Sequence, residues 1–240
     1  MKETETKQPC VVVLHEVWGS DSHIEGVCKR LGKLGFATTV PDLYSGYEAL
    51  LTPVNIQNAM EAVWDLSLDE RRDKKKVADE LARKNLRGKE AETLATLYDQ
   101  RFREGLMKIT MDAVAKGRAD HGKVATLGFS LGGGLSLAAA TRLDPPDSVV
   151  AYCGEPPRPP TLDGVSVPML AIYAHHDELM NPKMPGFVDA ALRHGNDLTV
   201  RTIPNTEHDF FNETKKERYD PEATEEAWAI TTWFLNRTLR

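Results

Sequence analysis

Residues 124–141 read VATLGFSLGGGLSLAAAT, and this stretch decides the fold of the chain. It begins with an apolar run typical of a buried strand and ends in small residues that follow a helical pattern. Between them, Ser130 stands at the tip of the Gly-x-Ser-x-Gly turn at 128–132. Such a turn strains the serine backbone and needs glycines on both sides, because side chains there would collide with a strand or helix. The stretch predicts a strand, a sharp turn and a helix, although the pentapeptide alone also fits an ordinary glycine-rich turn.

Composition restricts the class of protein. A chain of 240 residues with 41% hydrophobic content predicts one α/β domain, 1–240, with a substantial core. A net charge of -6 without a basic stripe argues against nucleic acid as a partner. No apolar stretch approaches the roughly 18 residues that span a bilayer, and residues 1–8 are polar. We expect a soluble, cytoplasmic protein that does not bind membranes; the sequence does not indicate its oligomeric state.

The cysteines and histidines do not form metal motifs. Cys10, Cys28 and Cys153 are an odd number without Cys-x-x-Cys spacing, so we expect reduced thiols and no zinc site. His15 and Glu16 do not begin a zinc protease motif, because the fourth residue after His15 is a glycine. The sequence therefore predicts no metal and no cofactor.

Six short runs rich in apolar and β-branched residues recur along the chain, with helical patterns between them. Several are apolar throughout, which is typical of strands buried on both faces of a parallel sheet. Their alternation with helices predicts the α/β class, with a doubly wound, mainly parallel sheet of about six strands. The predicted strands are 10–14, 36–40, 123–127, 148–153, 169–174 and 198–203.

The segment between the second and third strands is longer than one crossover helix requires. It is strongly charged and has apolar residues at helical spacing, so we predict a helical insertion at about 47–105, followed by the crossover helix. The insertion is either a lid over the strand ends or a solvated pair of surface helices. Its charged run at 69–76, with Arg71 and Arg72, is expected to be a solvated face.

Three residues with the chemistry of acyl transfer follow different strands. Ligands of parallel sheets bind beyond the carboxyl ends of the strands, where Ser130, Asp177 and His208 are expected to lie. A serine hydroxyl needs a base within hydrogen-bond reach, and the base needs a carboxylate to orient it. The chain order Ser, Asp, His is the one expected for a serine on a strand-to-helix turn. We predict Ser130 as nucleophile, His208 as base and Asp177 as the orienting acid.

Competing residues have simpler interpretations. His23, His121 and His194 lie in helix or turn segments and are expected on the surface. Asp177 could instead cap the helix that follows it. Acyl transfer also requires donors for an oxyanion, and we predict the backbone N–H groups of Leu131 and Val17.

Several pieces together resemble the dienelactone hydrolase family of α/β-hydrolases. They are HEVWG at 15–19, PDLY at 41–44, GFSLGG at 128–133, Asp177 and EHDFFN at 207–212. The resemblance extends over nearly the whole chain and implies an α/β-hydrolase fold and a metal-free hydrolase of a small ester or lactone. It also implies that Glu16 lies beside the nucleophile and tunes its ionisation; a purely structural carboxylate is the alternative.

The sequence departs from the family pattern at two functional positions. Members named for dienelactone cleavage have a cysteine where this chain has Ser130, so the part played by Glu16 can differ. Asn212 stands where the family has an arginine for the substrate carboxylate. Arg71 and Arg72 of the insertion could supply a positive charge instead, but we expect them on the surface. We therefore expect an esterase for another small ester or lactone. A thioesterase or peptidase with the same triad, and a non-catalytic binding protein of this fold, are the alternatives.

Overall fold

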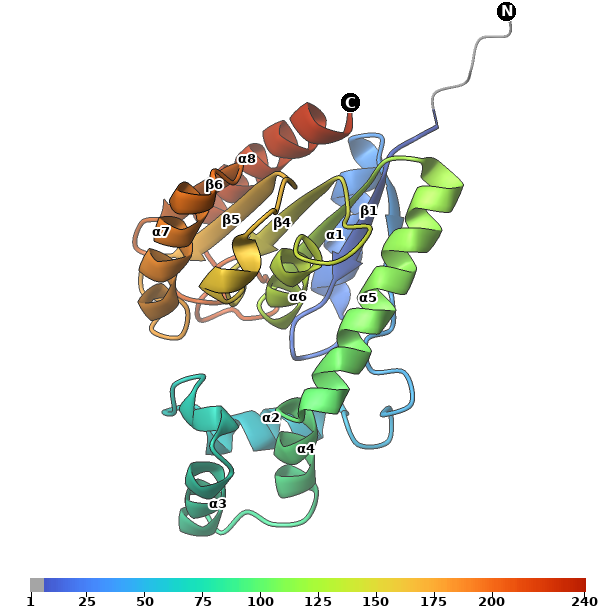
Figure 1. Ribbon diagram of the computed structural model, residues 1–240. Helices are drawn as coiled ribbons and strands as arrows, with labels where there is room; N and C mark the ends of the chain where they lie inside the picture. The colour runs from blue at the N-terminus through green and yellow to red at the C-terminus, as the bar shows by residue number, and fades with distance from the viewer. Residues whose placement is uncertain (1–6) are drawn as a thin grey trace, which may run out of the picture.

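The computed structural model describes residues 7–240, which form a six-stranded sheet in the order β2-β1-β3-β4-β5-β6. Every neighbouring pair of strands is parallel, and helices cover both faces, which confirms the predicted doubly wound α/β fold (Figure 1). The boundaries differ from the predicted runs by at most two residues. The strands are β1 Cys10–Leu14, β2 Ala37–Thr39, β3 Val124–Phe129, β4 Ser148–Tyr152, β5 Met169–Ala174 and β6 Leu198–Ile203.

The helices alternate with the strands except between β2 and β3, where several occur in succession. Within residues 7–240, none of them combines the length and the apolar character needed to cross a membrane. The α-helices are α1 Ser22–Lys33, α2 Pro53–Ala62, α3 Lys74–Arg83, α4 Lys89–Leu97, α5 Gln100–His121, α6 Leu131–Ala139, α7 Met184–His194 and α8 Pro221–Leu239. Short 3-10 turns are η1 Glu70–Arg72, η2 Pro159–Leu162 and η3 Asn181–Lys183.

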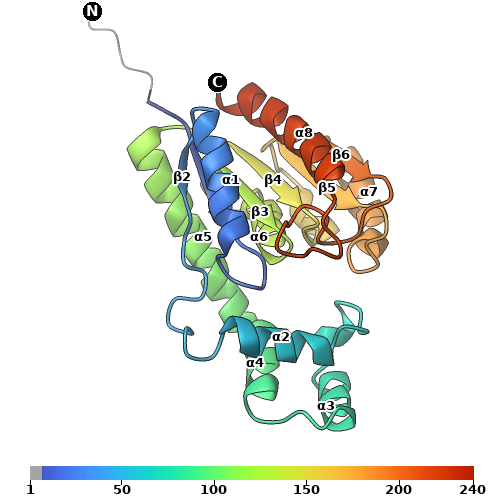
Figure 2. The same ribbon diagram turned by 180° about the vertical axis from the view of Figure 1, so that it is seen from behind.

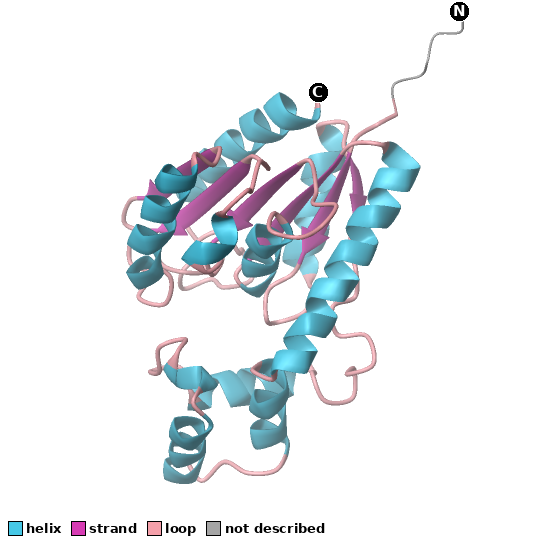
Figure 3. Ribbon diagram, viewed as in Figure 1, coloured by secondary structure: helices cyan, strands magenta, loops and turns pink. Residues whose placement is uncertain are grey.

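The central strands are buried on both faces because helices pack on each side. Val11 and Val13 of β1 point into a core shared with α1 and α8, which lie on the face seen in Figure 2. Val12 and Leu14 point the other way, into a core shared with α5. Helices α5, α6 and α7 cover that second face (Figure 3). The uninterrupted apolar run at 10–14 follows from this two-sided burial.

Helices α2, α3 and α4 occupy the segment predicted as an insertion and lie below the sheet in Figure 1, beside the first turns of α5. Their apolar residues, among them Met60, Leu81 and Leu97, belong to the same buried cluster as Val12 and Leu14 of β1. The insertion is therefore joined to the sheet by a continuous hydrophobic core. The crossover helix α5 begins earlier than predicted, and it runs as one helix from Gln100 to His121.

The turn between β3 and α6 brings backbone directly against backbone. A Cβ atom on Gly132 would overlap the carbonyl group of Leu14 and lie 2.7 Å from the carbonyl oxygen of His15. A Cβ atom on Gly128 would overlap the carbonyl group of Gly132. The Gly132 N–H donates to the His15 carbonyl at 3.1 Å. Helix α6 can start beside the end of β1 only because these residues are glycines.

We expect Gly132→Ala to lower the free energy of unfolding by about 3 kcal/mol, because the added methyl group meets rigid backbone. Gly32→Ala in α1 is the matched control: no atom lies within 4 Å of the added carbon, and alanine favours a helix by about 0.5 kcal/mol. Urea unfolding of both variants measures the difference. Equal effects of the two substitutions would contradict the packing argument.

Candidate active site

Ser130 is held on the turn by its backbone. Its φ is 49°, in the left-handed region that non-glycine residues rarely adopt. Its N–H donates to the Tyr152 carbonyl of β4 at 2.8 Å, and Leu131 begins helix α6 directly after it. A strained backbone at a functional serine is the arrangement that the Gly-x-Ser-x-Gly motif predicts.

The three predicted catalytic side chains form one hydrogen-bonded chain. The Nε2 atom of His208 lies 2.9 Å from Ser130 Oγ, and its Nδ1 atom lies 2.7 Å from Asp177 Oδ2. Because a carboxylate only accepts, Nδ1–H donates to Asp177; when the ring is neutral, Nε2 accepts from the serine hydroxyl. Residues 130, 177 and 208 thus meet although they follow three different strands.

Asp177 bonds to His208 and also closes a turn, but it does not cap the helix that follows, since α7 has no side-chain cap. One carboxylate oxygen, Oδ1, accepts from the N–H groups of Leu179 and Met180, both at 3.1 Å, and so closes the turn after β5. The other oxygen bonds to His208. The turn fixes the carboxylate, so that the oxygen facing His208 cannot rotate away.

The imidazole of His208 is surrounded by negative charge. Burial alone lowers its pKa. The negative charges of Asp177, Asp209 and Glu16, Asp177 first, outweigh this effect and raise the pKa to about 9. The side chain is 13% exposed, so the ring can reach a substrate from the cavity side. The surroundings therefore stabilise the protonated ring that forms when a serine gives up its proton.

The predicted oxyanion donors lie on adjoining loops. The Gly132 bond to His15 fixes the start of α6 beside the loop that follows β1. The Tyr44 hydroxyl donates to the Val17 carbonyl at 2.6 Å and holds that peptide from the other side. Within the described residues, the N–H groups of Val17 and Leu131 donate no hydrogen bond. That these two groups bind an oxyanion stays a prediction.

Glu16 is buried, and its carboxyl group faces the loop of His208. Oε2 accepts from the Nδ2 group of Asn212, whereas Oε1 has no partner within the described residues. Burial, and after it the charge of Asp209, raises the pKa of Glu16 to about 8. The resemblance implied that Glu16 lies beside the nucleophile. Within the described residues, its side chain makes one hydrogen bond, to Asn212. When ionised, it raises the pKa of His208.

Cys153 is closer to the triad than its pattern indicated. Its Sγ atom, a carboxylate oxygen of Asp177 and a ring nitrogen of His208 all lie within 4.8 Å of one another. Burial raises the pKa of Cys153 well above its ordinary value, so the thiol is a neutral neighbour of Asp177.

Ser130 and His208 open into a cavity of about 90 Å³. Met60, Leu68 and Leu97 of the insertion line one side of it, so this part of the insertion forms a wall of the site. The sequence could not place this wall, because it depends on how the insertion packs against the sheet.

Arg71 also lines this cavity, and the prediction of a solvated face at 69–76 is wrong for this residue. Its side chain is 3% exposed, and it donates from Nε to the Leu66 carbonyl at 2.9 Å and from Nη2 to the Trp64 carbonyl at 3.0 Å. The ring of Trp64 lies 5.9 Å from the guanidinium, and Glu155 lines the same cavity. The described residues give Arg71 no carboxylate within ion-pair distance, and such a buried cation is costly.

Arg72, its neighbour, contributes to an ion cluster that ties the insertion to the sheet. Glu155, after β4, accepts from Arg72 at 2.5 Å, from Lys183 at 3.2 Å and from Arg103 at 3.3 Å. Lys183 also pairs with Asp69 of the insertion at 2.9 Å. Burial raises the pKa of Glu155, but the cations, Arg72 first, lower it to about 2.

One histidine expected on the surface is buried instead. His23 packs edge-on against Phe129, with 4.8 Å between the ring centroids, and its Nδ1 atom lies 2.8 Å from Glu213. His194 is exposed, as predicted, and His121 is half-buried. His23 is the second residue of α1, two positions after the capping Asp21, and the polar residues around it gave no sign that its ring faces inward.

Comparison with known proteins agrees with this geometry. The family model for the dienelactone hydrolase family matches residues 1–239. A Saccharolobus solfataricus protein whose name marks it provisionally as a carboxymethylenebutenolidase is 30% identical, over 97% of this chain and 91% of its own length. The protein named usf from Aquifex pyrophilus is 26% identical, over 96% of this chain and 89% of its own.

Solved structures share the fold. A dienelactone hydrolase-like promiscuous phosphotriesterase from metagenomic libraries superposes with a TM-score of 0.68 at 18% identity, covering 100% of this chain and 90% of that one. The dienelactone hydrolase of Anabaena variabilis gives 0.56 at 21% identity, covering 98% and 89%. With the match of the family model over nearly the whole chain, the conclusion follows that this protein belongs to the dienelactone hydrolase family and is a hydrolase of the esterase type.

Proposed function

We propose that the protein cleaves a small carboxylic ester or lactone through an acyl-enzyme on Ser130, with His208 as base and Asp177 as its orienting acid. The observation that carries this proposal is the unbroken hydrogen-bonded chain from Asp177 to the Ser130 hydroxyl at the wall of the cavity. Membership of an ester-hydrolysing family supports the reaction class.

The reaction proceeds in two halves. His208 Nε2 accepts the hydroxyl proton as Ser130 Oγ attacks the carbonyl carbon, and the N–H groups of Val17 and Leu131 stabilise the oxyanion. His208 then donates the proton to the leaving-group oxygen as the carbon–oxygen bond breaks; in a lactone this oxygen stays attached to the acyl chain. Water, activated by His208 in the same way, attacks the acyl-enzyme and releases the acid and Ser130.

Arg71 restricts the substrate to molecules with a negative charge near the ester. Its guanidinium lines the cavity without a carboxylate partner in the described part of the chain, and two backbone carbonyls hold it in place. A substrate carboxylate there gains a charge-assisted hydrogen bond and offsets the buried cation. The family has an arginine where this chain has Asn212, and Arg71 of the insertion takes over its role in this proposal.

Glu16 acts in this proposal as a neutral acid near pH 7. Its raised pKa keeps a proton on the buried carboxyl group, so that His208 faces fewer negative charges than its neighbours suggest. When ionised at higher pH, Glu16 favours the protonated form of His208. This role concerns the base, and it does not depend on whether the nucleophile is serine or cysteine.

Replacing the nucleophile tests the central claim. Ser130→Ala is expected to lower kcat/KM for phenyl acetate at least about a thousandfold with an unchanged circular dichroism spectrum, because the triad acts as a unit. Intact-mass measurement should find a fluorophosphonate adduct on the wild type and none on the variant, and Ser166→Ala at an exposed serine should behave as wild type. Near wild-type turnover by Ser130→Ala would refute the assignment. Higher kcat/KM on thioesters or amides than on esters would reassign the substrate class.

Removal of the Arg71 charge should change selectivity between two isosteric esters. The measured quantity is the ratio of kcat/KM for 3-acetoxybenzoate to kcat/KM for 3-acetoxybenzamide. This ratio is expected to be about tenfold lower in Arg71→Gln than in the wild type, because a charge-assisted hydrogen bond is worth about 1.5 kcal/mol or more. The ratio does not depend on the fraction of folded enzyme. Arg87→Gln, at an exposed arginine of the insertion, should leave it unchanged. An unaltered ratio in Arg71→Gln would exclude an anion contact.

The pH dependence of stability tests the protonation of Glu16. Its folded-state pKa lies above its unfolded value, so its contribution to stability is present at low pH and is lost as the pH rises towards 8. Glu16→Gln mimics the protonated form, and its free energy of unfolding should gain on the wild type between about pH 4.5 and pH 8. Urea unfolding across this range gives the slopes, with exposed Glu25→Gln as control. Parallel slopes for wild type and Glu16→Gln would show that Glu16 is ionised.

A further inference from the structure

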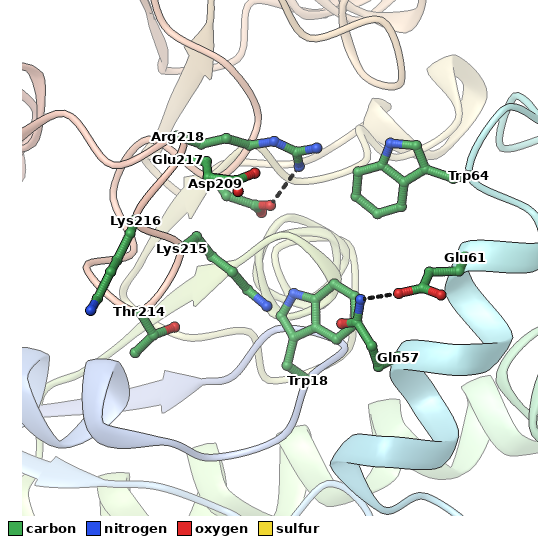
Figure 4. A pocket seen from close by; sticks show the side chains of 10 residues that line it. All are labelled: Trp18, Gln57, Glu61, Trp64, Asp209, Thr214, Lys215, Lys216, Glu217 and Arg218. Atoms are coloured by element: carbon green, nitrogen blue, oxygen red, sulfur yellow. Dashed lines mark hydrogen bonds and ion pairs between the residues drawn. The ribbon is translucent and has the colours of Figure 1, made fainter.

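Arg218 contacts three side chains at once, two on the loop of His208 and one on the insertion. Its Nη1 atom lies 3.0 Å from Asp209 Oδ2, and its Nε atom lies 3.3 Å from Glu207 Oε2. These carboxylates belong to the two residues that flank His208 in the chain. The carbon of the same guanidinium lies 4.8 Å from the ring centroid of Trp64, which follows helix α2 of the insertion (Figure 4).

Trp64 continues this contact into the cavity. Its carbonyl accepts from Arg71, and the Arg71 guanidinium lies 5.9 Å from its ring. Trp64 therefore lies between an arginine that lines the cavity and an arginine that holds the loop of the catalytic base. The insertion and the loop of His208 meet through the Trp64 ring.

The segment that carries Arg218 also touches the loop of the proposed oxyanion donor. Lys215 Nζ lies 3.9 Å from the ring centroid of Trp18, the residue after Val17. Figure 4 shows these side chains around a hollow of about 540 Å³, with Trp18 and Lys215 on one wall and Trp64 on the other. Residues 214–218 are thus positioned against the proposed oxyanion loop, the base and the insertion together.

We propose that Arg218 is a positioning residue that fixes His208 by clamping both of its chain neighbours to Trp64 of the insertion. The inference rests on the proposed function, in which His208 is the base. It names a residue outside the triad that couples the packing of the insertion to the geometry of the base.

Electrostatics gives this role a measurable signature. The groups that face His208 are Asp177 after β5, Asp209 on its own loop, Glu16 after β1 and the thiol of Cys153; Arg71 shares its cavity. Asp209 is buried, and its charge raises the pKa of His208. Arg218 offsets that charge at 3.0 Å. Without the cation, His208 holds its proton to a higher pH and is a base over a narrower range.

The experiment measures kcat/KM of phenyl acetate against pH for wild type, Arg218→Gln and Arg218→Lys. Activity rises with pH as His208 loses its proton, which gives the rising limb of the pH profile. In Arg218→Gln we expect this limb to move to higher pH by about half a unit to one unit. Arg218→Lys keeps the charge but loses the planar fork and the stacking, so kcat should fall severalfold with the limb in place. Trp64→Leu should lower kcat in the same way without moving the limb.

The chain offers a matched control. Arg237 pairs with Asp197 at 3.3 Å and lies 5.0 Å from the Trp233 ring, the same kind of arrangement on α8, and Arg237→Gln should reproduce the wild-type profile. A limb in Arg218→Gln that coincides with the wild-type limb overturns the inference. If Arg218→Gln does not fold, wild-type kcat in both Arg218→Lys and Trp64→Leu overturns it equally.

Ser130→Ala in the same assay separates the two claims. Activity retained by Ser130→Ala defeats the proposed function itself, whatever Arg218 does. An inactive Ser130→Ala together with an unmoved limb in Arg218→Gln defeats only the positioning role. The rate of fluorophosphonate labelling of Ser130 at fixed pH gives an independent measure, because it requires the same base, and it should be slower in Arg218→Gln than in Arg237→Gln.

Discussion

The close approach of Gly132 to the carbonyls of Leu14 and His15 is the constraint on which the rest of the site depends. It sets the start of α6 against the end of β1, so that Ser130, at its positive φ, lies beside the loop that follows β1. A side chain of any size there would separate β1 from α6. The position of the serine therefore depends on this contact between β1 and α6.

The remaining chemistry is a distribution of charge around one imidazole. The three carboxyl groups near His208 differ in their surroundings: Asp177 is bonded to the ring, Asp209 is paired with Arg218, and burial raises the pKa of Glu16. Each of them, when ionised, raises the pKa of the ring, and a ring that keeps its proton cannot act as a base. The site thus needs nearby acids to stabilise the imidazolium, and it needs their total negative charge to be limited.

The sequence predicted the sheet and the meeting of Ser130, Asp177 and His208, because parallel strands end at one edge and motif order restricts which side chains meet there. Whether these residues catalyse ester cleavage stays a prediction. The burial of Arg71 was not predicted, because a charged run has the same pattern whether it is solvated or folded against a cavity. Its burial depends on the hydrophobic contacts of the insertion with β1, and single-sequence patterns carry no information about such long-range packing.

The insertion forms part of the wall of the site, so its position and the position of His208 are linked. The cavity at Ser130 and His208 measures about 90 Å³, and two neighbouring hollows of about 570 and 690 Å³ share residues with it, among them Leu131 and His208. Two connections oppose a shift of the insertion: the Trp64 contact with Arg218 on one side and the Glu155 ion cluster on the other. Arg218 also pairs with the two chain neighbours of His208. A displacement of the insertion would therefore disturb the position of that imidazole.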